Sequence, residues 1–137
     1  MLNLRKVWER LLPSNSPDAP GDRATTRDTG LHHEQMASGY LRNQGFVIRA
    51  TNYRTRSGEI DIVALDEMTL VFVEVRFRSH PATLAEYTVD RTKQRKLWKT
   101  AAHYLRQHPW DGDVRFDVIA INGAALEHYQ DAFRGNE

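Results

Sequence analysis

The 137-residue chain contains no cysteine, so neither a disulfide framework nor a thiolate metal site can form. Any bound metal would have to be held by carboxylates or histidines. The chain also lacks a run of about 18 apolar residues, which a membrane-spanning helix would need. Its start, MLNLRKVWERLL, mixes charged with apolar residues and differs from the uninterrupted apolar segment of a secretory signal. We therefore expect a soluble, cytoplasmic protein with no membrane partner.

An excess of charge of one sign is also missing. The chain has 19 Lys and Arg against 18 Asp and Glu, which gives a formal net charge of +1. Nucleic acid responds to the way charge is distributed over a surface, so the net value excludes little. The length suits one domain with a hydrophobic core of its own.

The composition changes along the chain and divides it into three parts. Residues 4–11 have apolar side chains at helical spacing and predict a short amphipathic helix, docked on the body or on a partner protein. Residues 13–30 are rich in Pro, Ser, Gly and Asp and predict a flexible linker. We assign residues 1–30 to this helix and linker, residues 31–125 to the folded domain and residues 126–137 to a C-terminal tail.

Apolar periodicity predicts the elements of the folded domain. Helices are expected over residues 32–44 and 90–107, with Gly45 as the C-terminal cap of the first. Strands are expected over residues 46–54, 59–65, 70–78 and 114–121, and the second and third of these should form an antiparallel hairpin. This order predicts an α/β fold with a mixed sheet flanked by helices.

Three acidic residues interrupt the apolar hairpin. Side chains alternate along a strand, so Glu59 and Asp61 share one face, and Glu74 and Arg76 lie on a polar face of the next strand. A register that aligns Asp61 with Glu74 would bring two carboxylates within reach of one ion. Because two carboxylates repel each other, Mg²⁺ or Mn²⁺ would satisfy both. The alternative is a solvated sheet face with an ordinary ion pair between Glu74 and Arg76.

Asp61 followed by Glu74-Val75-Arg76 resembles the signature of the PD-(D/E)xK nucleases, in which an Asp, an acidic residue and a Lys lie on adjacent strands. The chain is also similar to the bacterial YraN-like family over residues 31–121. The shared motifs are, in order, the helix with Glu34, GEIDIVA, FVEVRFR, Lys93, AAHYL and RFDVIAI. The resemblance implies a restriction-endonuclease-like core, related in fold to archaeal Holliday-junction resolvases. It implies metal-dependent hydrolysis of DNA phosphodiester bonds, with structured or branched DNA among the substrates.

The resemblance also implies roles for individual residues. Asp61, Glu74 and Arg76 would be catalytic, and Glu34, Asp61 and Glu74 would bind Mg²⁺ or Mn²⁺. Arg76 stands where the signature has lysine. Arginine stays protonated, so it can hold a phosphate but cannot transfer a proton.

Arg76 leaves two interpretations open. Either Lys93 or Lys96 of the second helix substitutes for the missing lysine, or the chain is a catalytically inactive nucleic-acid-binding or adaptor module that keeps the nuclease fold. A third function, protein interaction through the N-terminal helix, would involve no salt-dependent binding of DNA.

The second predicted helix is basic, with no acidic residue between Arg91 and His108. Such a cluster fits the phosphate backbone of nucleic acid, because each neutralised phosphate releases counterions. The alternative is an ordinary solvated helix face. The expected nucleic-acid contacts are Arg54, Arg56, Arg78, Arg91, Lys93, Arg95, Lys96 and Lys99. We expect the partner to be DNA, and a homodimer would suit a reaction that cuts two strands.

Four other residues have competing interpretations. Trp98 lies on the apolar face of the second helix, which favours core packing over base stacking. Tyr53 lies among arginines and is either an aromatic contact beside phosphates or part of the structure. His33 precedes Glu34 and is an alternative metal ligand. Asp117, within an apolar strand, is expected to pair with a basic residue or to accept backbone amides.

Overall fold

A computed structural model describes residues 26–78, 89–123 and 125–133. These residues form two helices and five strands: α2 (Thr26–Asn43), β1 (Val47–Thr55), β2 (Gly58–Asp66), β3 (Thr69–Arg78), α4 (Arg91–Gln107), β4 (Asp113–Asn122) and β5 (Ala125–Phe133). The N-terminal helix expected over residues 4–11 lies outside the described residues. Residues 26–30 of the expected linker belong to α2.

The five strands form one sheet in the order β1-β2-β3-β4-β5. Neighbouring strands are antiparallel except β3 and β4, which are parallel. Parallel neighbours cannot be joined by a tight turn, and α4 lies between them in the chain. The expected hairpin of β2 and β3 is confirmed, and so is the α/β fold with a restriction-endonuclease-like core.

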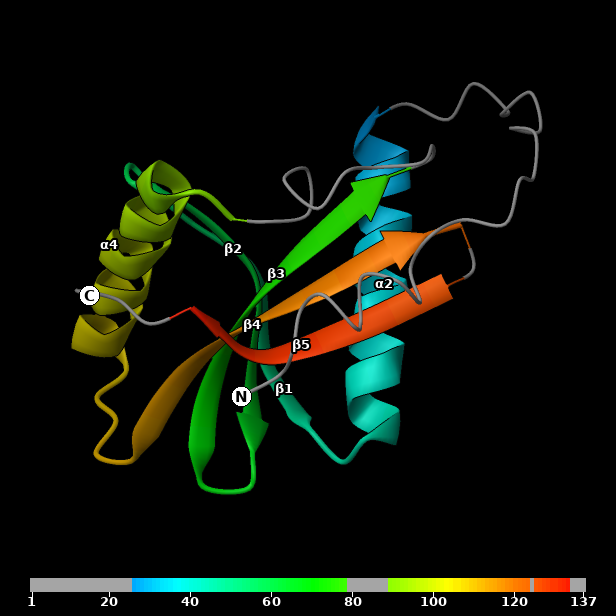
Figure 1. The fold of residues 1–137 in the computed structure, drawn as a ribbon. Coiled ribbons are helices and arrows are strands. Elements are labelled where there is room, and N and C mark those ends of the chain that lie inside the picture. Colours follow the sequence, from blue (N-terminus) through cyan, green and yellow to red (C-terminus); the bar gives the residue numbers. More distant parts are fainter. Residues whose placement is uncertain (1–25, 79–88, 124, 134–137) are drawn as a thin grey trace.

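The helices cover opposite faces of the sheet, so the domain has three layers (Figure 1). On one face, Ala37 and Leu41 of α2 belong to an apolar core that includes Val73. On the other face, Leu97 of α4 belongs to a second core that includes Phe72. Neither of the two described helices has the length and apolar character needed to cross a membrane.

Because a helix covers each face of the sheet, one expectation about β3 was wrong. The sequence predicted that the face of β3 bearing Glu74 is polar. Phe72 precedes Glu74 by two residues on that face and is only 1% exposed, and Glu74 itself is only 6% exposed. Because α4 covers this side of the sheet, Glu74 lies at the end of an apolar core instead of on a solvated surface.

Both helices have defined ends beside the sheet. The predicted cap at Gly45 is confirmed: its φ is 93°, and the Phe46 amide donates to the Leu41 carbonyl oxygen at 2.9 Å. At the start of α4 the Asp90 carboxylate accepts the backbone amide of Lys93 at 2.8 Å. These caps determine where α2 ends before β1 and where α4 begins.

Strand β5 was not among the expected elements. Its sequence, ALEHYQDAF, does not alternate apolar with polar residues, and among its apolar residues Tyr129 alone belongs to the buried core. It lies at the edge of the sheet, so it pairs with β4 alone. An edge strand can form without the apolar alternation by which strands are recognised in a sequence.

Asp117 of β4 is completely buried and has the polar partners that the sequence predicted. Arg115 donates to its two carboxylate oxygens at 2.9 and 3.1 Å, and His128 Nε2 lies 2.7 Å from Oδ2. The Asp131 amide donates to Oδ1 at 3.0 Å. Burial opposes ionisation of Asp117, but these hydrogen bonds outweigh it and hold the pKa of Asp117 below its ordinary value.

We expect Asp117→Ala to lower the free energy of unfolding by about 3 kcal/mol, because it leaves the half-buried Arg115 with Asp66 as its remaining acidic partner and removes the acceptor of His128 and of the Asp131 amide. Asp113→Ala, at an exposed position of the same strand, should change it by about 0.5 kcal/mol or less. Since folding lowers the pKa of Asp117, the difference should shrink as the pH falls below about 4. Urea unfolding measures both variants, and equal effects would contradict this account.

Candidate functional site

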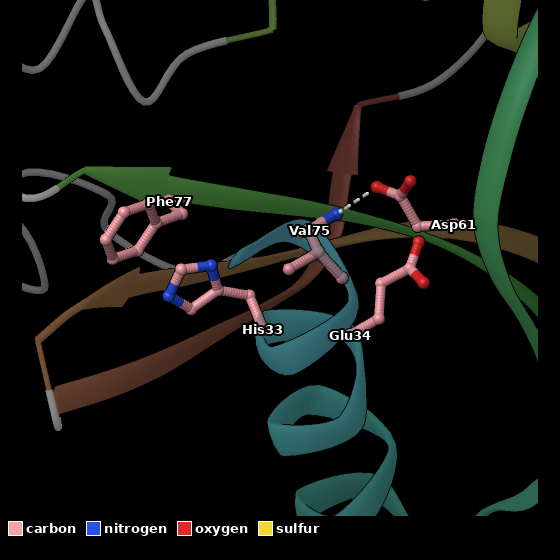
Figure 2. A pocket seen from close by; sticks show the side chains of 6 residues that line it. His33, Glu34, Asp61, Val75 and Phe77 are labelled. Carbon is pink, nitrogen blue, oxygen red and sulfur yellow. Dashed lines mark hydrogen bonds between the residues drawn. The ribbon is translucent and has the colours of Figure 1, made fainter. Parts of the chain in front are cut away.

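The site forms where the pairing of β2 and β3 ends. The antiparallel register runs from Asp66 and Thr69 to Ile62 and Val73. Continued by one residue, it places Asp61 opposite Glu74, which is the register that the sequence analysis required for the two carboxylates to approach each other. There Asp61 Oδ2 accepts the backbone amide of Val75 at 2.8 Å (Figure 2). A side chain therefore takes the place of a backbone acceptor at the point where the two strands separate.

Three carboxylates gather at this point. Glu34 reaches toward Asp61 from α2 (Figure 2), and Glu59 precedes Asp61 by two residues on β2. Each of Glu34, Glu59 and Asp61 offers an oxygen within 4.8 Å of those of the other two. We call these residues the three-carboxylate cluster. Asn52 Nδ2 donates to Glu34 Oε2 at 2.8 Å and helps to hold Glu34 in place.

Glu74 was expected to be a principal ligand, and the structure places it next to the cluster but not within it. Lys93 Nζ lies 3.3 Å from Glu74 Oε1, and Arg76 Nη1 lies 3.8 Å from the same oxygen. The side chain of Arg76 is 21% exposed and that of Lys93 42%. Glu74 is therefore a buried carboxylate with two cations beside it, and one of them comes from α4.

Burial dominates the electrostatics of these acids. It raises the pKa of Asp61 to about 8, helped by the charge of Glu74 and opposed by the hydrogen bond from Val75. Burial also raises the pKa of Glu74, against the influence of Lys93 and Arg76. The pKa of Glu34 is raised by burial as well, and the hydrogen bond from Asn52 opposes the rise. The position of Asp61, half-buried and close to other carboxylates, therefore disfavours its negative charge.

A cavity of about 120 Å³ opens beside the cluster and is lined by Gly30, His33, Glu34, Asp61, Val75 and Phe77. The His33 ring stacks on Phe77 with centroids 3.6 Å apart, so this wall of the cavity is aromatic (Figure 2). Burial lowers the pKa of His33, and the charge of His32 lowers it further. The volume accommodates a few water molecules beside the carboxylates.

The basic residues expected to contact nucleic acid divide into three sets. Exposed side chains on α4 and on the β1–β2 hairpin are Arg91, Arg95, Lys96, Lys99, Arg54 and Arg56. Of these, Arg54 also contacts the cluster, with its Nε 3.4 Å from Glu59 Oε2. Arg78 is half-buried, and its guanidinium donates to the Phe77 carbonyl oxygen. Lys93 is directed at Glu74.

The two aromatic residues left open by the sequence both pack in the domain. Trp98 lies against Phe116 with ring centroids 4.7 Å apart, which confirms core packing. The Tyr53 hydroxyl donates to Gln107 Oε1 at 2.8 Å and lies 2.7 Å from His103 Nδ1. Because Tyr53 is bound to α4 in this way, the structure supports its interpretation as a structural residue.

Sequence reasoning left two members of this site unassigned. Glu59 was placed on the same strand face as Asp61, and that alternation was the available signal for its membership of the cluster. Asn52 gave no signal, because its contact with Glu34 joins a strand to a helix and depends on how α2 lies over β1. The unusual backbone of Asn52, with φ of 53°, is visible only in the structure.

Comparison with known protein families shows which family the chain belongs to. The sequence profile described as "Uncharacterised protein family UPF0102" matches residues 33–121, which include the cluster, Glu74 and the whole of α4. The chain belongs to the UPF0102 family. This is the YraN-like family that the motifs resembled.

Similar UPF0102 proteins occur in several bacteria. That of Halorhodospira halophila is 44% identical over 113 residues, which cover 82% of this chain and 92% of that protein. The UPF0102 protein of Aeromonas hydrophila subsp. hydrophila is 38% identical over 137 residues, 97% of each chain. That of Thermodesulfovibrio yellowstonii is 42% identical over 107 residues, 77% of this chain and 96% of that one.

In this UPF0102 protein we expect Asp61→Asn to raise the free energy of unfolding in metal-free buffer. Folding raises the pKa of Asp61 to about 8, so the folded wild type binds an extra proton and loses stability as the pH rises toward 8. The amide oxygen of the substituted side chain can still accept the Val75 amide but carries no charge. We expect a gain on the order of 2 kcal/mol at pH 8.5 and a much smaller one at pH 5.

Thermal unfolding in EDTA at the two pH values measures this difference. Asp113→Asn, which removes an exposed carboxylate, serves as the matched control and should follow the wild type at both. If Asp61→Asn also followed the wild type, Asp61 would be an ordinary ionised carboxylate and the electrostatic account would be wrong.

Proposed function

We propose that this protein is a metal-dependent endonuclease that hydrolyses DNA phosphodiester bonds. The proposal is carried by one observation: the three-carboxylate cluster lies at the separation of two strands, with Glu74 next to it. The same residues, Asp61 and Glu74, are those that resemble the acidic positions of the PD-(D/E)xK signature. The exposed basic residues of α4 support a polyanionic substrate.

The cluster fits a hard divalent cation such as Mg²⁺ or Mn²⁺. Its donors are all carboxylate oxygens, which these ions prefer. The raised pKa of Asp61 indicates a site where positive charge is in deficit, and a cation would relieve the repulsion. Glu34, Glu59 and Asp61 would hold the ion, with Glu74 as a further carboxylate. When bound, it would supply charge that polarises a phosphodiester and acidifies water.

The residues of the chain would share the remaining work of the reaction. Hydrolysis joins a water oxygen to phosphorus and breaks one ester P–O bond, and the protons of the water end on the released alcohol and on the solvent. Arg76 can hold a phosphate oxygen but cannot transfer a proton, because its guanidinium stays charged. Phosphate contacts from α4 would position the strand without reading bases, so cleavage would be independent of sequence.

The finer parts of the proposal are the form of the substrate and of the enzyme. The resemblance to Holliday-junction resolvases favours structured or branched DNA as substrate. Cutting two strands would suit a homodimer, in which each copy supplies one cluster. DNA in bacterial cells lies in the cytoplasm, and we propose that location for the protein.

Cleavage of DNA tests the proposal directly. With Mn²⁺, the purified protein should cut at least one of plasmid, single-stranded and four-way-junction DNA. The Asp61→Ala, Glu74→Ala double variant should cut at least about 100-fold more slowly, because losing charge-stabilising groups costs that much in comparable sites. Asp111→Ala, Asp113→Ala removes the same charge from exposed positions and should cut like the wild type. Equal cleavage rates for the two double variants would contradict the proposal.

Binding of Mn²⁺ should depend on pH. Asp61 is protonated below a pKa of about 8 in the free protein, so an entering cation must displace that proton. We expect the affinity for Mn²⁺ to fall by about tenfold for each pH unit below 8 if one proton is displaced. Calorimetric titration between pH 6 and 8.5 measures the dependence. Asp61→Asn should bind Mn²⁺ weakly at every pH, and a wild-type affinity that does not change with pH would contradict the assignment.

A catalytically inactive nucleic-acid-binding module is the second candidate. The observation that favours it is the position of Glu74, which has Lys93 and Arg76 as partners and lies outside the three-carboxylate cluster. Under this alternative the wild type would bind DNA in a salt-dependent manner but never cut it. Cleavage that appears only after Arg76→Lys would establish it.

A further inference from the structure

We propose that Lys93 of α4 provides the phosphate-facing charge that the PD-(D/E)xK signature places two residues after Glu74, where this chain has Arg76. This inference rests on the nuclease function proposed above and names the side chain that would contact the scissile phosphate. The sequence left Lys93 and Lys96 equally open for this role. The structure separates them.

The Lys93 side chain extends to the carboxylate of Glu74. Its Nζ lies 3.3 Å from Glu74 Oε1, closer than the 3.8 Å of Arg76 Nη1 to the same oxygen. The two cations differ in their access to solvent, because the side chain of Lys93 is 42% exposed and that of Arg76 only 21%. A substrate approaching from solvent can therefore meet the ammonium group of Lys93 more readily than the deeper guanidinium.

The start of α4 fixes the direction of Lys93. The Asp90 side chain accepts the Lys93 amide at 2.8 Å, and the Asp90 carbonyl oxygen accepts the amide of Gln94 at 2.9 Å. Gln94 Nε2 in turn donates to the carbonyl oxygen of Val89 at 2.7 Å, and Val89 is buried in the core beneath α4. The first turn is thus attached to the core, which limits where the Lys93 side chain can extend.

Lys96 lies one turn further along and faces a different neighbour. It is exposed, and its Cβ lies 3.8 Å from the point that a Cβ on Gly58 would occupy, so it flanks the β1–β2 turn. Its position suits a contact with the backbone of a bound strand at some distance from Glu74. Lys93 and Lys96 therefore have separate roles on one helix, the first at the reacting phosphate and the second along the strand.

The chemistry of the two cations beside Glu74 supports a division of tasks. An ammonium group has three donors on a flexible stem, so Lys93 can keep one on Glu74 and turn the others to phosphate oxygens. Arg76 lies deeper and can continue to neutralise Glu74 when Lys93 turns. In the hydrolysis described above, Lys93 would hold an oxygen of the phosphate while the P–O bond breaks, without gaining or losing a proton.

Single-turnover cleavage tests the assignment in the full chain with Mn²⁺ and saturating DNA. Lys93→Met should lower the rate at least about 100-fold, as expected when a donor to the reacting group is lost, and change Kd for DNA in Ca²⁺ less than about threefold. Lys93→Arg, which keeps the charge, should recover most of the rate. Arg106→Met removes one exposed charge from the last turn of the same helix and should leave both quantities unchanged. A rate for Lys93→Met within threefold of the wild type would overturn the proposal.

A second readout does not depend on activity. In protein with ¹³C-labelled lysine, the Cε signal of Lys93 is assigned by its loss in Lys93→Arg. We expect this signal to shift when a short DNA duplex is added in the presence of Ca²⁺. A signal that does not move, or moves equally without Ca²⁺, would overturn the role of Lys93 even in an active nuclease. If the wild type cuts no DNA, the nuclease proposal fails, and this signal alone decides whether Lys93 faces the phosphate.

Discussion

The hydrogen bond from the Val75 amide to the half-buried carboxylate of Asp61 is the contact around which the site is arranged. It lies where β2 and β3 stop pairing, and it gives an ionisable side chain a hydrogen-bond partner at the end of an otherwise apolar hairpin. Because the strands separate there, α2 can bring Glu34 to Asp61 from the neighbouring layer (Figure 2). Removing Asp61 would therefore remove the acceptor of the Val75 amide as well as a proposed metal ligand.

Positive charge is distributed unevenly over the acids of the site. Glu74 has Lys93 and Arg76 beside it, so the protein itself compensates that carboxylate. Asp61 is held by a neutral amide, and the guanidinium of Arg54 that reaches Glu59 belongs to a largely exposed side chain. A buried carboxylate is costly unless it is paired or coordinates a metal. This asymmetry is the physical reason to expect an external cation at the three-carboxylate cluster and a substrate phosphate near Lys93.

The sequence was sufficient for features that depend on local rules. Strand alternation and a short turn predicted the hairpin of β2 and β3, and the periodicity of α2 ending at Gly45 predicted its cap. The order of the elements predicted a mixed sheet flanked by helices, and the resemblance of the motifs implied the restriction-endonuclease-like core. Within the match to UPF0102, the expectations about individual catalytic roles remain proposals.

Other features depended on packing between layers, which no local pattern contains. Strand alternation could not show that α4 buries Glu74, because the cover comes from an element that follows later in the chain. The choice between Lys93 and Lys96 depends on how α4 is rotated about its axis, which the Asp90 cap and the core contacts determine. Strand β5 was not predicted because an edge strand buries few of its side chains and so leaves little apolar pattern in the sequence.

The most direct test of the central claim is to locate a divalent cation by anomalous X-ray scattering from a crystal of the protein soaked in Mn²⁺. The account predicts a manganese peak in contact with Asp61 and with at least one of Glu34 and Glu59. A crystal that shows manganese bound elsewhere on the chain, or none at Asp61 when Mn²⁺ is saturating at pH 8, would contradict it.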